Sequence, residues 1–171
     1  MKKIILAVAG LALGTGLLLA GKSRPAPAPN GIELPADFAD WRLVSTSARA
    51  DNDTLRAILG NKAAIKAARA GSINPWPDGA ILAKVAWRRE DIKEWPPAAV
   101  PGGFVQVEFM IKDSRKYART GGWGFARWLG AELKPYGKDA GFVDECFSCH
   151  QPVKDRDFVF TRPAFMPLPG R

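Results

Sequence analysis

The alternation of apolar and polar residues in the first half of the chain predicts strands and one helix. Residues 41–47 have the composition of a short strand. Residues 54–70 carry apolar side chains at helical spacing and abundant alanine, with capping residue types just before them, so we expect a helix that ends at Gly71. Residues 74–79, Asn-Pro-Trp-Pro-Asp-Gly, are typical of a turn.

Two stretches with strict alternation predict the next strands, over residues 80–87 and 104–111. The proline-containing segment between them, residues 96–103, is expected to be a loop. Each strand carries one charged residue on an otherwise largely apolar face, Lys84 in the first and Glu108 in the second. A charged side chain in such a place requires an explanation if that face is buried.

The remainder of the chain predicts short elements. We expect a short helix over residues 113–117, a strand over 123–129, a turn or short helix over 142–150 and a final strand over 158–161. Strands and helices do not alternate regularly, which favours an α+β domain around a mostly antiparallel sheet over a parallel α/β fold.

The N-terminus has the form of a secretory signal peptide. Two lysines follow Met1 and precede an uncharged apolar run that ends at Ala20. A transmembrane anchor is the alternative, but glycines interrupt the run, and its length is near the lower limit for a span. We therefore expect residues 1–20 to be removed on export to the periplasm, with a cut after Ala28 as the alternative. Residues 21–31 are expected to form a proline-rich linker and residues 32–171 one domain.

The formal net charge of the 171-residue chain is +8. A basic surface favours nucleic acid, anionic lipid or an acidic protein as partner. No run of Lys and Arg is dense enough to mark a nucleic-acid groove, and export argues against that partner. We expect an acidic redox partner and no nucleic acid.

The two cysteines and the one histidine of the chain form a single motif, Cys146-Phe147-Ser148-Cys149-His150. Cys-x-x-Cys-His is the attachment signature of haem c: the thiols add to the two vinyl groups of one haem, and the histidine ligates its iron. A disulfide is an alternative, although so small a loop stabilises little. A thioredoxin-like pair belongs early in a βαβ unit, and a zinc site needs a fourth ligand. We therefore expect one covalent haem c per chain.

The other axial position of the iron has few candidate ligands. A second histidine does not exist, and after loss of the leader the methionines are Met110 and Met166. Met110 is predicted to be a core residue and Met166 a surface residue. The resulting open position indicates binding of a small molecule or catalysis.

From about residue 34 to residue 162 the sequence resembles the cytochrome P-460 family. The resemblance is carried by residues 76–79, by residues 107–114 ahead of the Gly-Gly-Trp-Gly turn, by the Cys-x-x-Cys-His motif, and by residues 157–162 after it. It implies a mostly antiparallel β fold with a few helices, usually in a homodimer. The proline-rich loop over residues 90–103 departs from the family pattern, which leaves the substrate open.

The resemblance also implies roles for individual residues. Lys84 matches a lysine that bonds covalently to a haem meso carbon, Glu108 a distal proton relay and Arg56 a distal arginine. Members with the cross-link oxidise hydroxylamine through bound nitric oxide, whereas cytochromes c′-β bind nitric oxide in an apolar pocket without that activity. The residues alone also allow Lys84 to face water on an edge strand, Glu108 to form a cross-strand salt bridge, and the protein to be a simple electron carrier.

Overall fold

The computed structural model describes residues 24–167 as one antiparallel sheet with helices against it. The predicted signal peptide lies outside these residues. The strands follow one another in chain order across the sheet: β1 (Arg42–Arg49), β2 (Thr54–Gly60), β3 (Ile81–Asp91), β4 (Ala99–Lys112), β5 (Trp123–Leu129) and β6 (Lys134–Pro135). The helices are α1 (Lys62–Ala70) and α2 (Phe142–His150), with short 3-10 helices η1 (Phe38–Asp40), η2 (Ala118–Thr120) and η3 (Gln151–Arg156). The predicted α+β class with a mostly antiparallel sheet is confirmed.

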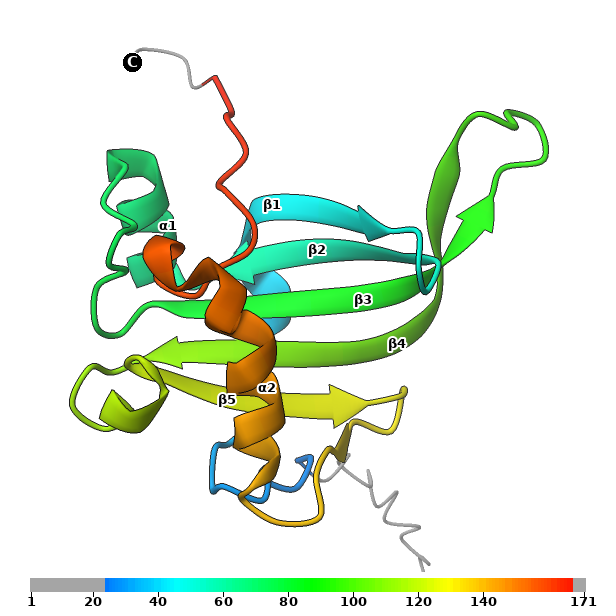
Figure 1. Cartoon of the computed structure of the whole chain (residues 1–171). Coiled ribbons are helices and arrows are strands. Elements are labelled where there is room, and N and C mark those ends of the chain that lie inside the picture. Colours follow the sequence, from blue (N-terminus) through cyan, green and yellow to red (C-terminus); the bar gives the residue numbers. More distant parts are fainter. Residues whose placement is uncertain (1–23, 168–171) are drawn as a thin grey trace, which may run out of the picture.

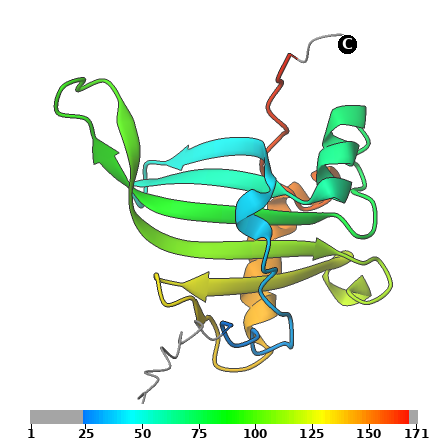
Figure 2. The same cartoon turned by 180° about the vertical axis from the view of Figure 1, so that it is seen from behind.

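The two faces of the sheet have different covers. Helix α2 crosses one face, as Figure 1 shows, and the segment that precedes β1 runs over the other, as Figure 2 shows from behind. On the second face Phe109 is 1% exposed and packs edge-on against Trp128, Phe38 and Trp41. This aromatic cluster makes one face a dry core, so the face beneath α2 is the one on which charged residues gather.

The helix predicted over residues 54–70 is wrong in its first half, where strand β2 stands instead. The predicted capping residues 51–53 form the turn of a β1–β2 hairpin, in which Asp53 has a φ of 48°. The strand ends at Gly60, where a Cβ would lie 2.7 Å from the Val44 side chain. Helix α1 begins only after Asn61, whose side chain accepts a hydrogen bond from the Ala64 N–H at 2.9 Å. The end of the helix at Gly71 is confirmed.

The loop predicted over residues 96–103 is shorter than expected. Strands β3 and β4 continue past the sheet as a projecting hairpin (Figures 1 and 2), paired as far as Asp91 and Ala99. Trp95 near its tip is 64% exposed. The prolines of this segment therefore mark the hairpin end and a register irregularity rather than one long loop.

Three smaller predictions also need correction. Residues 114–117 form a turn followed by η2 instead of a helix, and residues 158–161 are irregular instead of a strand. Asp157 and Phe158 have positive φ angles of 50° and 63°, which are incompatible with an extended strand. Packing begins before the expected end of the linker: Ala28 is 3% exposed, and the indole of Trp128 donates to the Ala26 carbonyl at 2.9 Å.

Among residues 24–167, no helix has the length and apolar character required to cross a membrane.

Candidate functional site

A cavity of about 870 Å³ lies between α2 and the sheet. Its lining includes the residues for which a haem-binding or catalytic role is expected: Arg56 on β2, Lys84 on β3, Glu108 on β4, and Cys146, Cys149 and His150 on α2. The structure therefore brings together, in one hollow, residues that span almost a hundred positions of the chain. Ligand sites of this size commonly hold drug-sized or cofactor-sized molecules.

Helix α2 presents its two thiols and its imidazole to the cavity because positions three and four apart lie on one helix face. Both cysteines are free thiols. Cys146 is buried, and burial raises its pKa to about 11, whereas Cys149 is exposed. Cys146 carries a neutral thiol and Cys149 an exposed thiol. Both are compatible with covalent attachment of a group that enters the cavity.

His150 lies at the C-terminal end of α2, and a hydrogen bond at its Nδ1 atom fixes its ring. Its Nδ1 lies 2.7 Å from the carbonyl oxygen of Phe158. Burial lowers the pKa of the imidazole, and the Phe158 hydrogen bond opposes this effect only in part. A carbonyl can only accept, so Nδ1 carries the proton and Nε2 has the free lone pair that a metal requires.

The sheet wall of the cavity is a row of charged residues in register. Lys84 on β3 is directly opposite Glu108 on β4, which in turn is opposite Arg127 on β5. Lys84 Nζ forms an ion pair with Glu108, and these side chains are 32% and 17% exposed. Glu108 Oε1 also accepts from Gln106 Nε2 at 2.7 Å. Glu108 thus forms the cross-strand salt bridge that the residues alone allowed. Lys84 is on an interior strand rather than on an edge facing water.

Arg127 was not singled out by the sequence. Its Nε lies 2.8 Å from Glu108 Oε1, and its Nη1 lies 3.7 Å from Glu145 on α2. The guanidinium also stacks 4.3 Å from the centroid of the Tyr136 ring, and the Tyr136 hydroxyl donates to Glu145 at 2.7 Å. Arg127 therefore links the sheet wall to the helix that carries the thiols.

Arg56 lies on the same side of the sheet, one strand away from Lys84. Its guanidinium donates to the Thr54 hydroxyl at 3.2 and 3.3 Å. Burial and the nearby charge of Arg49 lower its pKa. The side chain is thus a second cation of the cavity, at the end where β1 and β2 turn.

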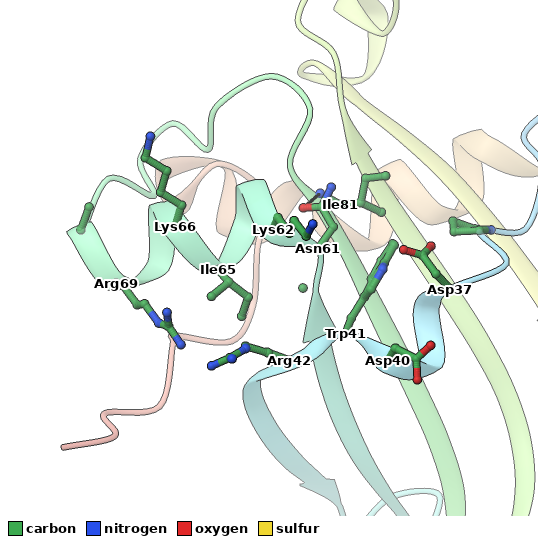
Figure 3. A pocket seen from close by; sticks show the side chains of 13 residues that line it. Asp37, Asp40, Trp41, Arg42, Asn61, Lys62, Ile65, Lys66, Arg69 and Ile81 are labelled. Carbon is green, nitrogen blue, oxygen red and sulfur yellow. Dashed lines mark hydrogen bonds between the residues drawn. The ribbon is translucent and has the colours of Figure 1, made fainter. Parts of the chain in front are cut away.

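A second hollow, of about 1090 Å³, lies between α1 and the start of β1 (Figure 3). Asp37 and Asp40 stand on one side of it, with Trp41 and Ile65 in its apolar part. The cationic residues that line it are Arg42, Lys62, Lys66 and Arg69. It shares no lining residue with the cavity beneath α2, and neither cysteine nor histidine lines it. The cavity beneath α2 is therefore the one that fits a haem.

The donor set fits haem c: two thiols three positions apart, an adjacent neutral imidazole, and a cavity of sufficient volume between helix and sheet. The fold and this site together define a c-type haem protein. Residues 35–161 match the model of the Cytochrome P460 family, and the chain belongs to that family. Membership implies a haem cofactor with its iron. The comparison with curated proteins found no match.

Proposed function

We propose that the protein is an exported cytochrome with one haem c per chain, which oxidises hydroxylamine and passes the electrons to a redox partner. The observation that carries this proposal is the row Lys84, Glu108 and Arg127, which lies across the cavity from Cys146 and His150. In this proposal the thiols of Cys146 and Cys149 attach the haem, and His150 ligates its iron. The haem supplies an open iron position for the substrate nitrogen and an acceptor for its electrons.

Glu108 receives the protons that hydroxylamine loses as it is oxidised. Its carboxylate is the acidic group of the sheet wall, and the Gln106 amide and the Arg127 guanidinium fix its orientation. A carboxylate held in this way on the cavity wall can act as a general base toward a substrate bound in the cavity. Arg56, with its cationic head in the same cavity, orients the polar substrate.

The test is steady-state hydroxylamine oxidation by the Glu108→Gln variant. We expect the variant to keep its haem but to lose most turnover, by about 10²–10⁴-fold if Glu108 is the base. The matched control is Glu145→Gln, since Glu145 contacts the same Arg127 but is 58% exposed. Unchanged turnover in Glu108→Gln would remove the proton relay from the proposal.

Lys84 is assigned to the haem edge. Its amine lies on the cavity wall, in the place where the family resemblance implies a covalent bond to a meso carbon. The expected signature of that bond is a strongly red-shifted Soret band in the dithionite-reduced protein. A Lys84→Met variant should show the ordinary haem c spectrum, and an ordinary spectrum in the wild type would show that the bond is absent.

Two alternatives are favoured by particular residues. Ile58 and Leu82 give part of the cavity an apolar lining, which suits nitric oxide binding of the c′-β kind. Met110 also lines the cavity, which suits a six-coordinate electron carrier, whereas Met166 is 51% exposed. A five-coordinate haem c without hydroxylamine turnover would support the first. A low-spin spectrum that is lost in Met110→Ala would support the second.

The acidic redox partner is proposed to dock at the rim of the cavity, beside exposed Arg88. Attraction between opposite charges speeds such encounters and weakens with salt. With an acidic cytochrome as acceptor, Arg88→Glu should slow electron transfer and weaken its salt dependence. Lys66→Glu makes the same charge change in the separate α1 hollow (Figure 3) and should leave the rate unchanged. Equal effects of the two variants would refute docking at the rim.

Export and assembly complete the proposal. Cleavage after residue 20 and a periplasmic location are tested by N-terminal sequencing of the mature protein from a periplasmic fraction. The homodimer is tested by sedimentation of the mature holoprotein, where a monomer at micromolar concentration would contradict it.

A further inference from the structure

The orientation of His150 depends on a carbonyl group in an unusual stretch of backbone. The acceptor of its Nδ1–H is the carbonyl of Phe158, at 2.7 Å. Phe158 and the residue before it, Asp157, both have positive φ angles, of 63° and 50°. Side-chain-bearing residues rarely adopt this conformation, and it persists only where surrounding contacts hold it.

The contacts that hold it converge on Asp157. Its carboxylate accepts from Lys112 Nζ at 2.6 Å and from the Trp76 backbone N–H at 2.8 Å. Its carbonyl accepts from the Trp123 indole at 2.8 Å. Lys112 and Asp157 are only 6% and 7% exposed. The end of β4, the start of β5 and the 74–79 turn are thereby tied to one residue, which is the neighbour of the carbonyl that orients the imidazole.

Lys112, the cation of the ion pair with Asp157, is also held by several contacts. Lys112 Nζ also donates to the Gly121 carbonyl at 3.2 Å and lies 4.9 Å from the Trp123 ring centroid. The ring of Phe158 packs against Gly121, where an added Cβ would lie 2.2 Å from it, and against Phe147 at 5.3 Å between centroids. The side chains of Asp157 and Phe158 are thus both anchored, on the two residues that flank the peptide leading to the Phe158 carbonyl.

We propose that the buried Lys112–Asp157 ion pair is the positioning device of the axial histidine. It holds the 157–158 backbone so that the Phe158 carbonyl accepts from His150 Nδ1, which sets the ring orientation and makes the imidazole a more basic iron ligand. Lys112 and Asp157 act through His150 and touch neither haem nor substrate. The inference rests on the proposed ligation of iron by His150.

The test uses the mature holoprotein, with haem attached during export, and compares three variants with the wild type. Asp157→Asn keeps an acceptor for the Trp76 N–H but removes the anion. Lys112→Met combined with Asp157→Asn removes both charges, so that no buried charge is left unpaired. Asp144→Asn is the control, because it breaks the exposed Arg119–Asp144 pair at the other end of α2, with side chains 78% and 63% exposed.

The readouts are the iron–histidine stretching frequency of the reduced protein, by resonance Raman spectroscopy, and the haem reduction potential. A weaker Nδ1 hydrogen bond makes the ligand less basic, so the stretching frequency should fall and the potential should rise in both Asp157 variants. Asp144→Asn should match the wild type. If Asp157→Asn does not accumulate with haem, the stretching frequency and potential of the double variant alone test the proposal.

The contrary result is a lower thermal midpoint with wild-type frequency and potential, since a purely structural ion pair would give that combination. A wild-type protein that carries no covalent haem, or whose iron lacks a histidine ligand, would instead refute the proposed function. The two failures are therefore distinguishable.

Discussion

The buried ion pair between Lys112 and Asp157 gives the most quantitative prediction for the stability of the fold. Both side chains are less than a tenth exposed, at 6% and 7%. Removing one partner of such a pair costs about 3–5 kcal/mol, because the other charge remains buried without compensation. In Asp157→Asn the single amide oxygen can accept from Lys112 Nζ or from the Trp76 N–H, but not from both; since one of the two contacts is kept, we expect the low end, about 3 kcal/mol. For a domain of this size that corresponds to a fall in Tm of roughly 10 °C.

Urea unfolding of the apoprotein measures this loss without any contribution from haem. The control is again Asp144→Asn at an exposed pair, where about 0–1 kcal/mol is expected. The double variant Lys112→Met with Asp157→Asn should recover most of the loss, because neither charge then remains buried. If Asp157→Asn and Asp144→Asn lose the same free energy of unfolding, the buried pair does not hold the 157–158 backbone as described.

Two further predictions concern close packing and thiol chemistry. Gly121→Ala should destabilise the protein by about 1–3 kcal/mol more than Gly79→Ala. Both glycines have positive φ angles, but only at Gly121 would an added Cβ lie against the Phe158 ring, at 2.2 Å. Equal free energies of unfolding for the two variants would contradict this packing. In apoprotein treated with iodoacetamide, Cys149 should react before Cys146, whose thiolate fraction at pH 8 is about one in a thousand for a pKa of about 11. The Cys146 rate, read by peptide mass spectrometry, should rise about tenfold per pH unit up to that pKa; a rate that already levels off at about pH 8.5, the pKa of an unperturbed thiol, would show that the thiol is not buried.

The parts of the fold that the sequence predicted are those with a strong local signal. Strict alternation marked β3 and most of β4, and Gly71 marked the end of α1. The helical spacing over residues 54–60 misled because apolar residues that fit a helix also fit a half-buried strand in so short a stretch. The strand expected over residues 158–161 failed for a different reason. Asp157 and Phe158 have positive φ angles, and Asp157 forms a buried ion pair with Lys112, 45 positions away, a contact that no local pattern records.

The residues of the candidate site also divide into those that the sequence predicted and one that it did not. The thiols and the imidazole are adjacent in the sequence, and Lys84 and Glu108 stood out as charges on apolar strand faces. Arg127 carries the same signal within residues 123–129, but the glycine and tryptophan content of that stretch obscured its alternation. Its ion pair with Glu108 depends on the pairing of β4 with β5 and could not be predicted locally.

The central claim is that this chain holds one haem c through Cys146 and Cys149. Intact-mass spectrometry of the mature protein under denaturing conditions tests it most directly, because only a covalently bound haem survives denaturation. We expect the mass of the chain from residue 21 onwards plus one haem, and the mass of the bare chain for a Cys146→Ala, Cys149→Ala, Lys84→Met triple variant. A bare chain from wild-type protein that was purified with its haem would contradict covalent attachment.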